Sequence, residues 1–116
     1  MRKHDVFYIQ CMLDFSNKVL ARANDRSREA FDTDEDFALI IERLVEKIGE
    51  AARCVSYELR EAHPEVRWKE IVGVRHRLAH DYTNVDYDIL WQIVSNDLPV
   101  LVEQLTIVRQ QMNEIT

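Results

Sequence analysis

The sequence is short of the residues that interrupt regular structure: its 116 positions include only 2 Gly and 2 Pro. It also lacks Asn-Gly and Asp-Gly pairs, the usual signal of a tight β-hairpin. A chain with 47% hydrophobic residues and so few breakers is typical of helices joined by short connections. At this length we expect one domain over residues 1–116, built around one hydrophobic core.

Long apolar runs are absent as well. No stretch approaches the roughly 20 residues that span a bilayer, and the start, Met1–Asp5, lacks the core of a signal peptide. We therefore expect no membrane association and a cytoplasmic location. Cysteine is scarce: Cys11 and Cys54 are the only two, without CxxC spacing. We expect both to be buried apolar side chains in a reducing compartment.

Positive charge is scarce overall but gathered in one place. The net charge of −6 argues against a protein that coats nucleic acid in general. Residues 66–80, however, carry a local charge of +3, which leaves −9 for the rest of the chain; the charged residues are Arg67, Lys69, Arg75 and Arg77 against Glu70. An acidic body with one basic spot favours a focused anion-binding site over a long nucleic-acid groove.

The apolar spacing predicts helices along the whole chain. The first covers residues 4–23, and a polar connection follows over residues 24–32, with Phe31 as an anchor in the core. Thr33 is expected to cap one long helix over residues 34–62, which Pro64 ends. In its middle, three small residues would let another helix approach closely: Gly49, Ala51 and Ala52.

The second half of the chain is predicted to hold shorter elements. A helix starts near Arg67 or Trp68 and frays near His80, and Asp86 caps the next helix, in which Pro99 predicts a kink around residues 96–98. The fold class is therefore all-α, an antiparallel bundle of four to five helices. Helical spacing places Trp68 and Trp91 in the core or an interface, although both could stack on bases.

The densest group of chemically active residues is the stretch from Val74 to Tyr82. Arg75 and His80 lie five positions apart, so on a continuous helix they would be separated by roughly 140°. If they act together, the helix must end near Ala79, or a second copy of the chain must complete the site. Arg can hold a phosphate bidentately, and His can act as acid or base near neutral pH.

Arg75 and His80 would suffice to cleave an RNA phosphodiester whose 2′-hydroxyl is the nucleophile. That reaction needs a proton acceptor, a proton donor and a cation on the phosphorane, but no metal. One chain offers one well-placed His, and two chains around a twofold axis offer two. A solvated basic helix end explains the same residues without any chemistry.

A zinc site is the rival interpretation of this stretch. His76 and His80 have the i, i+4 spacing of helical zinc ligands, and Asp81 or Asp86 could be a third ligand. However, Arg77 follows His76 where zinc proteases carry a catalytic Glu, and the neighbouring arginines would repel a cation. We expect neither a metal nor another cofactor.

The order of several segments resembles the HepT-like HEPN ribonuclease toxins over roughly residues 34–105. The R-x4-H-x-Y motif of that family matches Arg75, His80 and Tyr82. The other matching segments are Ile48-Gly49-Glu50-Ala51-Ala52, Leu59-Arg60, His63-Pro64-Glu65, Trp68, Ile71-Val72-Gly73-Val74, Asp81, Val85-Asp86 and Asn96-Asp97-Leu98-Pro99.

This resemblance implies a HEPN fold that forms a homodimer, with the motifs of both chains meeting at a cleft. It implies a metal-independent endoribonuclease that is the toxin of a toxin–antitoxin pair, neutralised by a nucleotidyltransferase antitoxin of the MNT type. Arg75 would stabilise the scissile phosphate, His80 would be the general acid or base, and Tyr82 would be the tyrosine that accepts AMP. Arg77 would support the site.

The chain departs from the family pattern at His76, where the family usually has Asn directly after the motif Arg. A second titratable ring there could change the pH profile or the orientation of the substrate. The alternative function is therefore a non-catalytic HEPN module that binds or scaffolds a nucleotidyltransferase.

Overall fold

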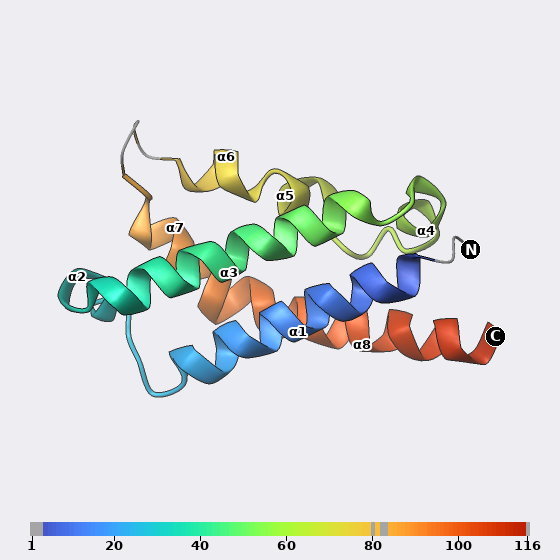
Figure 1. Cartoon of the computed structure of the whole chain (residues 1–116), viewed down its shortest axis with the longest axis horizontal. Helices are drawn as coiled ribbons and strands as arrows, with labels where there is room; N and C mark the ends of the chain where they lie inside the picture. Colours follow the sequence, from blue (N-terminus) through green and yellow to red (C-terminus); the bar gives the residue numbers. More distant parts are fainter. Residues whose placement is uncertain (1–3, 80, 82–83, 116) are drawn as a thin grey trace.

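The computed structural model describes residues 4–79, 81 and 84–115, with side chains up to Asn113. Three long helices, α1 (Asp5–Ala23), α3 (Glu35–Cys54) and α8 (Leu98–Ile115), run along the molecule, α1 antiparallel to the other two (Figure 1). Over these described ranges the chain forms helices and no strand, only an isolated bridge. The predicted all-α bundle is confirmed. None of the helices described is long and apolar enough to cross a membrane.

The core lies where α1 packs against α3 and α8. Its most deeply buried side chains come from all three helices and from the residues that connect them: Ile9, Met12, Val19, Ile41, Val45, Val55, Leu90, Leu105, Val108 and Met112. Burying side chains of this size is the main force that holds such a bundle together, at about 1.5–3 kcal/mol each.

The predicted single helix over residues 34–62 is wrong, because the chain breaks between α3 and α4 (Tyr57–Ala62). Val55 and Ser56 are extended, with ψ angles of 137° and 150°. The backbone N–H and the hydroxyl of Ser56 donate to the buried carboxylate of Asp5, at 2.8 and 2.6 Å. The apolar spacing continues through the break because Val55 and Leu59 are both buried.

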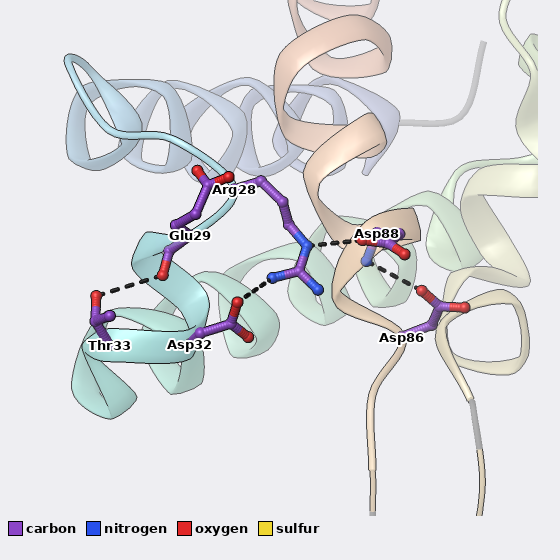
Figure 2. Close-up of polar contacts among 6 residues, drawn as sticks. All are labelled: Arg28, Glu29, Asp32, Thr33, Asp86 and Asp88. Atoms are coloured by element: carbon purple, nitrogen blue, oxygen red, sulfur yellow. Dashed lines mark hydrogen bonds and ion pairs between the residues drawn. The ribbon is translucent and has the colours of Figure 1, made fainter.

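The start of α3 also differs from the prediction. Thr33 is the last residue of the short helix α2 (Ala30–Thr33), and its hydroxyl donates to the carbonyl of Glu29 (Figure 2). The cap is Asp34, whose carboxylate accepts the N–H of Phe37 at 3.1 Å. Phe31 is buried and stacks on Phe37 with ring centroids 5.3 Å apart, so its predicted role as an anchor is confirmed.

The last helical run is irregular before Pro99, as predicted. It consists of α7 (Tyr87–Gln92), a π-helical turn η1 (Ile93–Asp97) and α8. A π turn inserts an extra residue into the helix, and such turns often occur at functional sites. Here the turn ends at Asp97, whose carboxylate lies 3.0 Å from the guanidinium of Arg77.

Trp68 takes its predicted core position and Trp91 packs against the core, but the cysteine prediction fails in part. Trp68 is buried and donates Nε1–H to the carbonyl of His63, while the partly buried Trp91 makes an edge-to-face contact with Phe31. Cys54, expected to be buried, is exposed at the end of α3, and Cys11 is only partly buried. Burial, together with the nearby charge of Asp14, raises the pKa of the Cys11 thiol.

Candidate active site at the end of α6

The basic stretch forms two short helices, whereas one had been predicted. α5 (Trp68–Val72) and α6 (Val74–Leu78) meet at Gly73. Val74 and Leu78 point into the core, with 5% and 2% of their surface exposed. The charged residues between them therefore face outward, and α6 presents Arg75, His76 and Arg77 on the surface of the bundle.

A glycine on α3 sets how closely α6 approaches the bundle. A Cβ atom on Gly49 would lie 2.7 Å from the carbonyl oxygen of Ile71 and 2.9 Å from Cγ1 of Val74. These distances are too short for any side chain, so only glycine allows α3 to contact the α5–α6 junction directly. The close approach predicted at the small residues of α3 is confirmed at this position.

α6 ends where cooperation between Arg75 and His80 requires it to end. Ala79 has left the helical conformation, with φ −65° and ψ 118°, and its N–H donates to the carbonyl of His76 at 3.3 Å. The chain therefore does not continue along the helix axis after Leu78. His80 and Tyr82 themselves lie outside the residues that the structure describes.

The loop after α6 is closed at its base. Ala79 and Val85 form an isolated antiparallel bridge, and the N–H of Asp86 donates to the carbonyl of Leu78 at 2.8 Å. Within the loop, the carboxylate of Asp81 accepts both the backbone N–H and the side-chain amide of Asn84. The chain is thus held on both sides of the segment that carries His80 and Tyr82.

The downstream side of the loop is fixed to the rest of the bundle through α7. Asp86 caps this helix, as predicted, by accepting the N–H groups of Asp88 and Ile89. Arg28 then donates to Asp88 at 2.7 Å and to Asp32 at 2.8 Å, joining α7 to α2 (Figure 2). Hydrogen bonds to Asp88 and then to Asp32 raise the pKa of Arg28.

Arg75 is the most exposed of the site's arginines and pairs with a residue that the sequence did not single out. Its side chain is 74% exposed, and its Nε lies 3.4 Å from Oε2 of Glu46 on α3. Glu46 lies three positions before Gly49. The small residues that predict a close approach of another helix to α3 were therefore the sequence signal that could have identified Glu46 as a partner. On α6, Arg75 therefore leans towards α3.

Arg77 has a carboxylate partner on the opposite side of α6. Its Nη2 lies 3.0 Å from Oδ2 of Asp97, the last residue of the π turn, and both side chains are 35% exposed. Arg67 lies 3.7 Å from Glu70. The local positive charge inferred from the sequence is therefore partly offset by acidic partners, two of which come from distant positions in the chain.

A small apolar pocket borders this site without including Arg75. It measures about 160 Å³ and lies between α3, the α5–α6 pair and the start of α8. Its apolar lining includes Val45, Ile71 and Leu101, and the paired Arg77 and Asp97 also line it. The Arg77–Asp97 pair thus separates the exposed basic face of α6 from this pocket.

His76 is exposed on α6. Among the residues described, no three His, Cys, Asp or Glu side chains gather as metal ligands would. The zinc arrangement considered from the sequence also needs His80, which lies outside them.

The fold and the site together define a class: an all-α protein whose short cationic helix ends just before a loop carrying His and Tyr. A family model described as "Ribonuclease HepT-like" matches residues 12–108. The chain therefore belongs to the ribonuclease HepT-like family, a class of RNA-cleaving enzymes. This confirms the resemblance found in the sequence.

Curated relatives agree with this membership. The chain is 36% identical over 109 residues to "Putative RNase MJ1380" of Methanocaldococcus jannaschii, covering 93% of this chain and all of the relative. It is 34% identical over 104 residues to "Putative RNase TTE0752" of Caldanaerobacter subterraneus, covering 90% and 93% of the two chains. It is 39% identical over 70 residues to "Probable ribonuclease HepT" of Thermococcus cleftensis, covering 60% and 62%. No solved structure matches the chain.

Proposed function

We propose that this chain is an endoribonuclease that cleaves RNA without a metal ion, with Arg75 and His80 as its catalytic residues. The observation that carries the proposal is the end of α6 at Leu78, with the hydrogen bond from Asp86 to Leu78 closing the following loop. Because α6 ends before His80, the separation of roughly 140° that a continuous helix would impose on the two residues does not apply. Membership of the family and the names of the relatives support the same activity.

The proposed reaction uses the 2′-hydroxyl of RNA as its nucleophile. A base takes the proton of this hydroxyl while its oxygen attacks the phosphorus, and an acid protonates the 5′-oxygen as the P–O bond breaks. The products are a 2′,3′-cyclic phosphate and a free 5′-hydroxyl. His80 is the acid or base, and Arg75 stabilises the extra negative charge on the phosphorane. His76 and Arg77 support the site from the same helix.

One chain supplies only one His80, whereas the reaction needs both an acid and a base. We therefore propose that two copies form a homodimer, with the two α6 ends facing a shared cleft. A C2 dimer uses the same surface on both subunits, so the shared cleft would hold two copies of the motif.

The proposed biological setting is a toxin–antitoxin pair in which a nucleotidyltransferase of the MNT type neutralises the ribonuclease. Transfer of AMP to Tyr82 would place a bulky phosphate group two residues from His80. That group would exclude RNA by its size and its negative charge. Equal ribonuclease activity before and after stoichiometric adenylylation would contradict this part of the proposal.

The test is an assay of the purified chain on total bacterial RNA, with and without EDTA, read on denaturing gels. We expect cleavage that EDTA does not abolish, and a loss of cleavage in His80→Ala and Arg75→Ala. Size-exclusion chromatography of the same variants must show an unchanged oligomeric state, so that a loss of activity reports chemistry. Cleavage by His80→Ala at the wild-type rate would refute the assignment.

A second function stays open because His76 replaces the family's usual Asn. In that case the chain would be a non-catalytic HEPN module that binds a nucleotidyltransferase. The same variants separate the two functions. If Arg75→Ala and His80→Ala change only the affinity for the nucleotidyltransferase, and the wild-type chain leaves RNA intact, the binding module is the correct function.

A further inference from the structure

The two side chains of the Glu46–Arg75 ion pair differ strongly in their exposure to solvent. The side chain of Glu46 is 20% exposed, whereas that of Arg75 is 74% exposed. Glu46 is built into α3, a helix of 20 residues that packs on α1, α5 and α6. The carboxylate is therefore the fixed member of the pair, and the guanidinium is the member that projects from the surface.

The contact is made at one particular edge of the guanidinium. Oε2 of Glu46 lies 3.4 Å from Nε of Arg75, the nitrogen nearest the side-chain stem. A carboxylate at Nε leaves the outer edge, formed by Nη1 and Nη2, for a second anion. That outer edge is a planar fork that matches two oxygens of a phosphate.

We infer that Glu46 is a positioning residue for Arg75, holding Nε so that the outer edge of the guanidinium faces the scissile phosphate. This inference rests on the proposed ribonuclease function of Arg75. Glu46 acts through Arg75 and does not itself contact RNA. Its contribution is to restrict a long and otherwise mobile side chain to one orientation.

The approach of the helices supports this role. Gly49 seats Val74 directly against α3, and Arg75 is the next residue along the chain. Glu46 lies about one helical turn before Gly49, on the same helix. The short distance between the Glu46 carboxylate and Arg75 is thus a consequence of the close approach of α3 to the α5–α6 pair at Gly49.

The size of the effect separates positioning from ordinary stabilisation. Ion pairs that are largely exposed to solvent contribute little to stability. A displacement of about 1 Å in a group that binds the reacting phosphate can reduce the rate by about 100-fold. Loss of Glu46 is therefore expected to reduce turnover much more than it reduces the stability of the fold.

The chain offers a matched control at Glu50. Glu50 is the next turn of α3, carries the same charge and pairs with Arg43 at 3.2 Å. Arg43 also lies 3.8 Å from Glu46, so both carboxylates share this neighbour. The Ala and Gln variants at positions 46 and 50 therefore remove the same charge from the same helix, and only those at 46 alter the Arg75 contact.

The experiment measures kcat and KM of the full chain against total bacterial RNA for all four variants. For Glu46→Ala we expect kcat to fall about tenfold or more, with a denaturation midpoint like that of Glu50→Ala. Glu46→Gln keeps the size of the side chain but removes the charge that attracts the guanidinium, so its kcat should also fall, whereas Glu50→Gln should not lower kcat. Equal kcat in Glu46→Ala and Glu50→Ala would overturn the inference, and so would a kcat of Glu46→Gln equal to that of the wild type.

A second measurement does not depend on cleavage. In ¹⁵N relaxation measurements, Nε of Arg75 should be more ordered in the wild type and in Glu50→Ala than in Glu46→Ala and Glu46→Gln. Equal order of Nε in the wild type and in Glu46→Ala would refute positioning. Failure of the proposed function is recognised separately, by a wild-type chain that leaves RNA intact or a His80→Ala variant that still cleaves it.

Discussion

The backbone N–H of Asp86 donates a hydrogen bond to the carbonyl of Leu78 at 2.8 Å. The last residue of α6 and the N-cap of α7 are therefore held together across residues 79–85. This bond and the Ala79–Val85 bridge make the loop a closed turn whose base is part of the bundle. The position of the loop depends on α7 as much as on α6.

Replacing Asp86 by Ala should loosen this turn. The substitution removes the acceptor for the N–H groups of Asp88 and Ile89, and the loss of an N-cap typically costs about 1 kcal/mol. We expect a lower free energy of unfolding in urea and faster amide hydrogen exchange over residues 84–90. Asp14→Ala is the control, because the exposed Asp14 carboxylate accepts a hydrogen bond from Gln10 on the same helix. Equal exchange in the two variants would show that the cap does not hold the loop.

Replacing Gly49 by Ala should push α6 away from α3. The added Cβ would meet the backbone oxygen of Ile71 at 2.7 Å, and overpacking of this kind costs about 1–3 kcal/mol. The better helix propensity of Ala would return about 0.5–1 kcal/mol. The net loss of stability should appear in urea denaturation and be accompanied by reduced RNA cleavage.

Gly73→Ala is the comparison for this substitution. Its nearest neighbour would be the backbone oxygen of Lys69 at 3.2 Å, and Gly73 has a φ of −87°, which Ala also adopts. We expect a smaller loss of stability than for Gly49→Ala. An equal or larger loss would mean that the close approach of α3 to the α5–α6 junction is not the tightest constraint on α6.

The helical class and much of the core could be predicted from the sequence because apolar periodicity reports which face is buried. The same periodicity could not locate the break between α3 and α4. Val55 and Leu59 remain buried on both sides of it, and the break is stabilised by Asp5, which is distant in the sequence. Helix ends that depend on such long-range contacts leave no local pattern.

The candidate site, like the fold, could be predicted from the sequence only in part. The end of α6 near Ala79 could be predicted, because residues 81–84 are poor helix sequence and because Arg75 and His80 of one chain could act together only if the helix ended there. The acidic partners Glu46 and Asp97 could not, because each lies on another helix and meets its arginine only in the folded chain. The basic character of the stretch was therefore overestimated from the sequence.

The two cysteines should differ in their reactivity towards iodoacetamide. Cys54 is exposed, whereas Cys11 is partly buried and its pKa is raised by burial and by Asp14, so less of it is thiolate at neutral pH. We expect rapid labelling of Cys54 and slow labelling of Cys11, measured by mass spectrometry of the folded chain. The Cys54→Ser variant should lose the rapid phase. A rapid phase that persists in this variant would contradict the exposure of the two residues.

The two arginines of α6 should contribute unequally to RNA binding. Arg75 is 74% exposed, whereas Arg77 is 35% exposed and lies 3.0 Å from Asp97. Both arginines have a carboxylate partner, but the partner of Arg77 is closer (3.0 Å against 3.4 Å) and its side chain is less exposed, so Arg77 has less to offer a phosphate. In a His80→Ala background, which should bind labelled single-stranded RNA without cutting it, Arg75→Ala should weaken binding more than Arg77→Ala. Fluorescence anisotropy at several salt concentrations measures the difference.

Releasing Arg77 from its partner should have the opposite effect. Asp97→Asn removes the competing charge but keeps the size of the side chain, so Arg77 becomes available to a phosphate. Each additional phosphate contact steepens the dependence of log K on log salt by about 0.7 for a single strand. We expect Asp97→Asn to bind RNA more tightly than the wild type at low salt and to show a steeper dependence of log K on log salt. Asp34→Asn is the control, because Asp34 pairs with Arg26 at 2.8 Å and an Asn can still cap α3. If Asp97→Asn and Asp34→Asn bind RNA alike, the Arg77–Asp97 pair does not limit the positive charge of the site.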